Sequence, residues 1–163
     1  MEQGTAKQKE QFLPGIAAGE TIFASGYSEQ QAGSDLATLK TQARLEGDLE
    51  TGHFVVNGAK LWTSGIESAD HVWLAARTSP DLARHKGISI MILDTDAPGF
   101  SHTLIKTVGN FTAATYYDNV EVPAHRRVGA CHGGWKPNPP PLHHERLGPG
   151  PGSDTGFGPL HRV

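Results

Sequence analysis

Residues 26–35 (GYSEQQAGSD) combine hydroxyl groups, a glycine and carboxylates at a spacing suited to holding a small ligand. An apolar stretch precedes this run and small, turn-forming residues follow, which predicts a loop that leaves a strand and turns back over a ligand. Ser28 and Ser34 carry hydroxyls that both donate and accept hydrogen bonds. Gly33 permits a positive φ and a close backbone approach. Asp35 is well placed to cap the backbone amides that follow it.

A second run, residues 57–65 (NGAKLWTSG), follows about one hairpin later. Its opening pair, Asn57-Gly58, is a strong signal for a two-residue β-turn. We therefore predict a hairpin with strands at residues 53–56 and 60–63. In this arrangement the aromatic and hydroxyl residues at the end of the second run face the serine-glycine loop.

The elements that must position these runs are mostly short strands. Apolar or alternating stretches recur at near-regular spacing, with Gly, Asp and Pro between them, which is typical of an all-β barrel or sandwich. Nothing in the alternation supports a βαβ unit, which argues against a Rossmann-type nucleotide site. The further predicted strands are residues 22–27, 39–46, 71–77, 88–93, 103–107 and 115–122.

A short helix is predicted ahead of the strands. Thr5 is a suitable N-cap, and Pro14-Gly15 is expected to end the helix soon after Phe12. Residues 7–11 (KQKEQ) are interpreted as a solvated helix face.

Bulk properties limit the possible functions. A chain of 163 residues has the length of one domain, and its formal net charge of −3 gives no basic face for nucleic acid or an anionic membrane. No apolar run approaches the length of a membrane span, and no signal-peptide pattern opens the chain. The lone Cys131 excludes an intrachain disulfide and suits a reducing compartment. We therefore expect a cytoplasmic protein, or one of an organelle matrix.

The C-terminal part has a different composition. Four prolines fall within residues 137–141 (PNPPP), and each internal proline costs a helix about 3 kcal/mol. Residues 148–152 (GPGPG) interrupt the chain again. We predict an irregular or disordered tail from about Pro137 onward.

The ordered set of motifs between about Phe12 and Gly129 resembles the middle domain of the FAD-dependent acyl-CoA dehydrogenases. The resemblance predicts a mainly β fold of that middle-domain type, a β-barrel or sandwich with a short N-terminal helix and an irregular C-terminal tail. It implies a remnant of an N-terminal helical domain (1–19), the β-barrel middle domain (20–130) and a degenerate start of a C-terminal helical domain (131–163), truncated at both ends. The matching runs are residues 12–15 (FLPG), 28–35, 58–65, 86–89 (KGIS), 98–99 (PG) and 120–123 (VEVP).

The resemblance also implies a set of flavin contacts. The Trp62 indole offers a large face for stacking on the isoalloxazine ring, and Ser64 is expected near flavin N5. Ser28 is expected to donate to the pyrimidine side, and Ser34 to meet both the flavin and the acyl-CoA pantetheine. An alternative for Trp62 is a place in the core, the usual site of a strand tryptophan. The cofactor-binding candidates are Ser28, Ala32, Gly33, Ser34, Trp62, Thr63 and Ser64.

The catalytic base is harder to assign. Acyl-CoA dehydrogenation removes an α-proton, which requires a carboxylate. One subset of the family uses a glutamate directly before an arginine, early in the C-terminal helical domain, and Glu145-Arg146 matches that pattern. Glu145 is therefore a candidate base and Arg146 a candidate contact for acyl-CoA. The alternative is that both are solvated side chains in a broken segment.

Other chemistry has weaker signals. The spacing of His132, His143 and His144 fits no zinc pattern, so no metal site is predicted. Asp94-Thr95-Asp96 is interpreted as a turn after a strand. No Gly-x-Ser-x-Gly elbow is present, so hydrolase chemistry has no nucleophile.

The combined expectation is part of an oxidoreductase of lipid or fatty acid metabolism that uses FAD to dehydrogenate an acyl-CoA thioester. Because the resemblance covers mainly the β-domain, we expect the isolated chain to be inactive. The alternatives are a non-catalytic β-module that forms homo- or hetero-oligomers with related subunits, or a decayed product without a role. A third and remote alternative is a generic β-sandwich binding domain.

Overall fold

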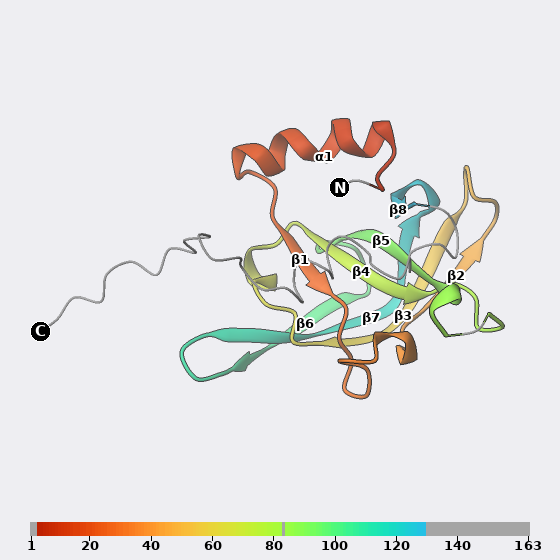
Figure 1. Cartoon of the computed structure of the whole chain (residues 1–163). Helices are drawn as coiled ribbons and strands as arrows, with labels where there is room; N and C mark the ends of the chain where they lie inside the picture. Colours follow the sequence, from red (N-terminus) through yellow and green to blue (C-terminus); the bar gives the residue numbers. More distant parts are fainter. Residues whose placement is uncertain (1–2, 83, 130–163) are drawn as a thin grey trace, which may run out of the picture.

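The computed structural model describes residues 3–82 and 84–129, and within them the chain forms one α-helix and eight strands (Figure 1). The expected mainly β fold with a short N-terminal helix is confirmed. The irregular tail predicted from Pro137 lies outside the described residues. The elements are α1 (Ala6–Ala18), β1 (Phe23–Gly26), β2 (Gln42–Glu46), β3 (His53–Leu61), β4 (His71–Arg77), β5 (Ile88–Asp94), β6 (Phe100–Lys106), β7 (Phe111–Pro123) and β8 (Arg127–Val128).

The strands form one sheet in the order β6-β7-β3-β2-β4-β5-β8, with β1 beside β4. Antiparallel ladders join β3 to β2 and to β7, β6 to β7, and β4 to β5. The connection between the two halves of the sheet is narrow, because β2 meets β4 in parallel only at Gln42 and Arg77. β1 pairs in parallel with residues 71–74 of β4.

The sheet folds over a core, as its alternating strands require. Side chains from β1, β3, β4, β5 and β7 pack into one buried cluster, so the two halves of the sheet face each other. Removing these apolar surfaces from water is the main favourable term in folding. The largest fully buried apolar side chains are Phe54, Leu39, Leu74, Ile88, Met91, Ile92, Leu93, Val56, Val72, Val120 and Val122.

Helix α1 begins as predicted but ends later. The Thr5 hydroxyl accepts from the Gln8 amide at 3.2 Å, and the Gln8 side chain accepts from the Thr5 amide at 2.9 Å, which forms a capping box. The prediction that Pro14 ends the helix was wrong, because the helix continues to Ala18. Proline removes only one backbone donor, and the helix terminates at Gly19, which adopts a φ of 73°.

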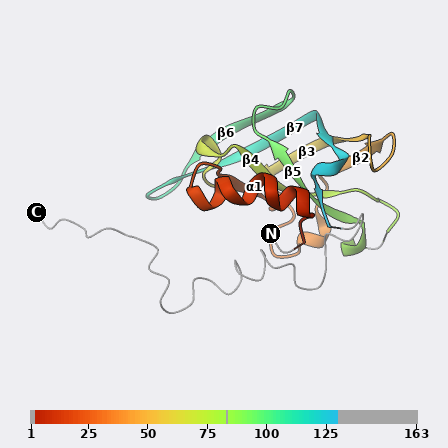
Figure 2. The same ribbon diagram turned by 90° about the horizontal axis from the view of Figure 1, so that it is seen from above.

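Helix α1 lies next to β4 and β5 on one side of the sheet in both views (Figures 1 and 2). The interpretation of residues 7–11 as a solvated face was wrong for Gln8. Its buried amide donates to the carbonyls of His125 and Arg127, each at 2.8 Å. Phe12 packs beside Ile92 in the same contact. Within the described ranges, no helix has the length and apolar character that a membrane crossing requires.

The hairpin predicted at Asn57-Gly58 was wrong, because β3 continues through both residues to Leu61. The Asn57 side chain instead exchanges hydrogen bonds with Asn119 of β7, at 3.1 and 3.0 Å. The register of β3 against β7 shifts between Val56 and Gly58, so the glycine forms a bulge rather than a turn. A long bent strand therefore carries residues 60–62 beyond the site where the sequence placed a turn.

Candidate functional site

The two sequence runs meet at the end of β3. Glu29 and Ala32 exchange backbone hydrogen bonds of 2.8 and 3.1 Å, which fold the chain into a tight turn over Gln30 and Gln31. The Ser28 carbonyl accepts from the Leu61 amide at 2.8 Å, which joins the turn to the end of β3. The structure thereby places Ser28 beside the residue that precedes Trp62.

Trp62 projects into solvent from a strained backbone position. Trp62 is 56% exposed, so the alternative that places it in the core was wrong. Its φ of 67° lies in the left-handed region, which bulky residues rarely adopt. Such a conformation costs about 1–3 kcal/mol and persists where the surrounding structure imposes it, commonly at functional sites. The exposed indole is therefore a feature that packing alone does not explain.

The residues after Trp62 are anchored to β7. Thr63 is fully buried: its amide donates to the Ala113 carbonyl at 3.0 Å, and its hydroxyl lies 3.4 Å from that of Thr115. A contact between Thr63 and a cofactor would have to come from its backbone. The exposed Ser64 hydroxyl lies 3.2 Å from that of Thr112, which orients it at the surface.

A buried ion pair lies beneath the turn. The Lys60 ammonium is 2.9 Å from a Glu29 carboxylate oxygen, and the two side chains are 0% and 10% exposed. Burial lowers the pKa of Lys60 to about 8, although the Glu29 carboxylate opposes this shift. Burial alone would raise the pKa of Glu29, but Lys60 and hydrogen bonds from Thr41 and Lys40 hold it below its usual value.

Two features of the loop differ from expectation. Gly33 does not adopt a positive φ, and a Cβ added there would meet no atom within 4 Å. Its backbone faces open space, as a surface approached by a ligand requires. Asp35 makes no side-chain cap, because the following turn is a single 3-10 turn, and the Asp35 carbonyl accepts from the Thr38 hydroxyl and amide instead. Asp35 and Ser34 both lie exposed.

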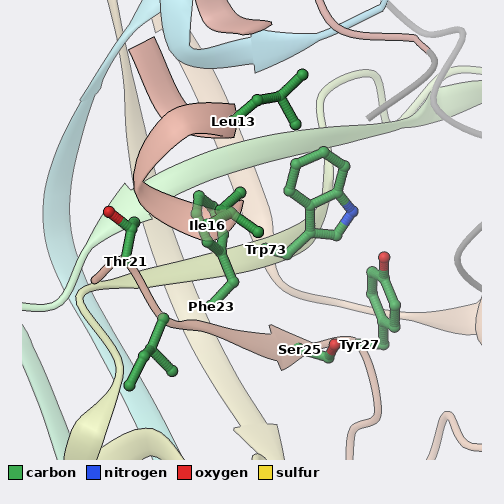
Figure 3. A pocket seen from close by; sticks show the side chains of 8 residues that line it. Leu13, Ile16, Thr21, Phe23, Ser25, Tyr27 and Trp73 are labelled. Carbon is green, nitrogen blue, oxygen red and sulfur yellow. The ribbon is translucent and has the colours of Figure 1, made fainter. Parts of the chain in front are cut away.

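An apolar pocket adjoins the loop (Figure 3). Its volume is about 530 Å³, and it lies between the C-terminal half of α1 and strands β1 and β4. Tyr27, directly before Ser28, forms part of its wall, so the pocket and the loop share a boundary. Within the described structure the buried Trp73 indole nitrogen makes no hydrogen bond. The lining residues are Leu13, Ile16, Thr21, Ile22, Phe23, Ser25, Tyr27 and Trp73.

Several predicted residues converge, and two cannot be placed. Ser28 and residues 62–64 lie at the junction of the turn with β3, while Ala32 is buried inside the turn. Glu145 and Arg146 lie outside the described residues. In the part of the chain that the structure describes, no three His, Cys, Asp or Glu residues lie close enough to hold a metal ion.

Sequence reasoning missed the supports of the site. Glu29 and Lys60 were noted only as members of their motifs, and none of Glu29, Lys60 and Thr112 was assigned a role in the site. A lysine within an otherwise uncharged strand was the available signal, because a charge there must find a partner. This arrangement can receive a flat aromatic ligand: it offers an exposed indole at Trp62, an oriented hydroxyl at Ser64 and open backbone at Gly33.

Comparison with known proteins gives a consistent set of matches. Residues 24–120 match the family model described as acyl-CoA dehydrogenase, middle domain. The chain is 50% identical over 151 residues to acyl-CoA dehydrogenase FadE26 of Mycobacterium tuberculosis, covering 90% of this chain and 37% of the relative. It is 47% identical over 150 residues to FadE29 of the same organism, covering 91% and 38%.

Solved structures agree with these matches. The Tcur3481-Tcur3483 steroid ACAD superposes with a TM-score of 0.83 at 50% identity, covering 90% of this chain and 38% of that chain. The ChsE4-ChsE5 complex from Mycobacterium tuberculosis gives 0.80 at 51% identity, covering 88% and 36%. The chain therefore spans a little over a third of the length of the relatives that it matches.

Proposed function

The chain belongs to the acyl-CoA dehydrogenase family, and from this premise we propose that its sheet supplies one wall of a site for FAD and an acyl-CoA thioester. The observation that carries the proposal is the exposed, strained Trp62 held beside the Ser28 turn. An aromatic face next to hydroxyl donors is the surface that an isoalloxazine ring requires. When bound, FAD would accept the hydride that leaves the β-carbon of the thioester.

The residues of this wall then divide the binding task. Trp62 stacks on the flat ring, and the Ser64 hydroxyl, oriented by Thr112, donates at the ring edge. The hydroxyl or amide of Ser28 donates at the opposite, pyrimidine side. Ala32, Gly33 and Thr63 contribute backbone, and the open space at Gly33 fits the close approach of a ligand.

The acyl-CoA is proposed to bind next to the flavin. Ser34 is exposed on the turn and available to both the flavin and the pantetheine. The apolar pocket beside Tyr27 offers a surface for the acyl chain, since hydrocarbon favours burial against apolar walls. Glu145 remains the proposed base and Arg146 a proposed contact for acyl-CoA.

We further propose that the chain does not complete this chemistry alone. Residues 20–130 form the β-domain, residues 1–19 correspond to the end of an N-terminal helical domain, and residues 131–163 to the start of a C-terminal one. The matched relatives are more than twice as long, and the described residues form one side of the site. We expect weak or no FAD binding and no turnover by the isolated chain.

The test is a titration of the purified chain with FAD, followed by absorbance on adding butyryl-CoA or a longer acyl-CoA. Residual FAD binding should fall at least about tenfold in Trp62→Ala, because the stacking face is lost. The control is Leu49→Ala, an exposed apolar residue in the turn at the other end of β3. Equal FAD affinity in both variants would refute the proposal that Trp62 contacts the flavin. Stoichiometric FAD binding with substrate-dependent bleaching would refute the proposal that the isolated chain is inactive.

A second candidate function is a β-module that assembles with a related subunit. Three apolar residues of the pocket rim, Leu13, Ile16 and Ile22, are 40–44% exposed, which favours a protein surface that covers them. Size-exclusion chromatography with light scattering tests this candidate. A monomer at all concentrations, alone and with a full-length relative, would exclude it.

A further inference from the structure

The Lys60–Glu29 pair is buried beneath the candidate site rather than exposed at its surface. An ion pair this far from water pays a large desolvation penalty, which its Coulomb attraction offsets only with good geometry and additional hydrogen bonds. An apolar pair of similar volume would often be at least as stable at such a position. The question is therefore what the charges accomplish that apolar side chains would not.

Each partner of the pair holds backbone groups of a different segment. The Lys60 ammonium donates to the Tyr27 carbonyl at 3.1 Å, directly before Ser28. The Glu29 carboxylate accepts from the amides of Lys40 and Thr41, at 2.7 and 2.9 Å, and from the Thr41 hydroxyl at 2.7 Å. These contacts join the turn, the start of β2 and the end of β3 through one pair of charges.

We propose that the Lys60–Glu29 pair is a positioning device that holds residues 27–29 in register with the end of β3. It touches no ligand and acts through the bond between the Ser28 carbonyl and the Leu61 amide, which sets the turn beside Trp62. The role in ligand binding rests on the function proposed above. The positioning of the turn itself does not, and the two are separately measurable.

The charges around Lys60 make this device sensitive to alkaline pH. Among the described residues, Glu29 is the charged group that shifts the pKa of Lys60. Lys40 extends from the turn side and donates to Gln31 at 3.1 Å, and both it and Asp35 are exposed. On the β7 side, Thr115 lies opposite Lys60 in the strand ladder, and the Thr115 hydroxyl forms a hydrogen bond with that of Tyr117. Burial raises the pKa of Tyr117 well above its usual range, so it stays neutral.

The direct test is amide hydrogen exchange, measured by NMR on the full 163-residue chain. In Lys60→Met the Leu61 amide should exchange at least about tenfold faster, because its acceptor at Ser28 loses its anchor. The Thr63 amide, which bonds to Ala113 of β7, is the internal reference and should not change. The matched control is Glu46→Gln, which removes an exposed ion pair with Arg44.

A pH titration separates positioning from simple packing. In the wild-type chain the amide shifts of Ser28 and Glu29, and the indole N–H shift of Trp62, should follow one transition near pH 8. The transition should be absent in Lys60→Met. A residue that acts only by filling space would show no such titration.

Additional variants keep the test decisive if Lys60→Met fails to fold. Glu29→Gln retains the size of the side chain and loses its charge. The double variant Glu29→Leu/Lys60→Met removes both charges and is expected to fold. Faster exchange of the Leu61 amide in either, with the Thr63 amide unchanged, supports the proposal.

The outcomes for the loop and for the ligand are distinct. Unchanged Leu61 exchange in the folded variants, or the same pH transition in Lys60→Met, would overturn the positioning role whatever FAD does. Equal residual FAD affinity in Trp62→Ala and Leu49→Ala, together with faster exchange of the Leu61 amide in the charge variants, would count against the proposed flavin wall and leave the positioning role supported.

Discussion

The polar groups at the two ends of β3 find their hydrogen-bond partners in different ways. At the His53 end, the connection to β2 satisfies itself: Asp48 accepts from the Glu50 and Thr51 amides and from the Thr51 hydroxyl, each at 2.8 Å. These bonds hold the pKa of Asp48 below its usual value. The polar partners of this end lie within a few residues in the sequence and are exposed to water.

At the Leu61 end, the hydrogen-bond partners are distant in the sequence. Lys60 finds its partners 31 and 33 residues away in the sequence, and Trp62 adopts a positive φ. Sequences generally obey local rules, and the exceptions tend to occur at functional sites. The difference between the two ends therefore agrees with the proposal that the Leu61 end belongs to a ligand site, whereas the other end only connects two strands.

The strongest way to break this comparison is to remove one buried charge. Lys60→Met removes the N–H donors to Glu29 and Tyr27, which the neutral amine keeps at alkaline pH, and should lower the free energy of unfolding by about 3–5 kcal/mol. Glu46→Gln removes the exposed partner of Arg44 and His53 near the other end and should cost less than about 1 kcal/mol. Urea denaturation at pH 7 measures both, and equal losses would remove the distinction between the two ends.

The bulge between the ends gives the next largest effect. A Cβ at Gly58 would lie 2.7–2.9 Å from atoms of Thr41, and the φ of Gly58 is 148°. Gly58→Ala should therefore destabilise the fold by about 2 kcal/mol and weaken the Thr41 contacts to Glu29. Gly33→Ala, with open space at the Cβ, is the control and should change stability little. Thermal unfolding of both variants checks the prediction.

A pH series sharpens the contrast further. Burial sets the pKa of Lys60 at about 8, below its ordinary value of 10.5. Between these values the unfolded chain binds more protons than the folded chain, so the free energy of unfolding rises with pH. The gain should be on the order of 1 kcal/mol per pH unit and absent in Lys60→Met. A wild-type and a variant chain with the same slope between pH 8 and 10 would contradict this assignment.

The smallest effect isolates the strain at Trp62. Glycine adopts positive φ freely, whereas alanine does not, so Trp62→Gly should be more stable than Trp62→Ala by about 1 kcal/mol. The usual order in regular structure is the reverse, because glycine loses more entropy on folding. Urea denaturation of the two variants gives the difference directly. An Ala variant as stable as the Gly variant would show that the positive φ carries no strain.

Much of the fold could be predicted from local patterns. Apolar or alternating stretches at near-regular spacing marked the strand regions from β1 to β7, and Thr5 as the N-cap marked the start of α1. Failures occurred where a local signal competed with distant partners. Asn57-Gly58 has the composition of a turn, but the ladder with β7 extends β3 through it. Pro14 has the composition of a helix stop, but one missing donor did not end the helix.

For the candidate site, the order of the residues was enough to propose its components, because hydroxyl, glycine and indole groups carry their chemistry wherever they lie. Their family membership also followed from that order. Whether Trp62 faced water or the core, and which carboxylate neutralised Lys60, depended on contacts between segments about 30 residues apart. Burial and charge pairing are properties of the packed chain, and no local pattern specifies them. The ion pair between Lys60 and Glu29 beneath the turn therefore forms only in the folded sheet.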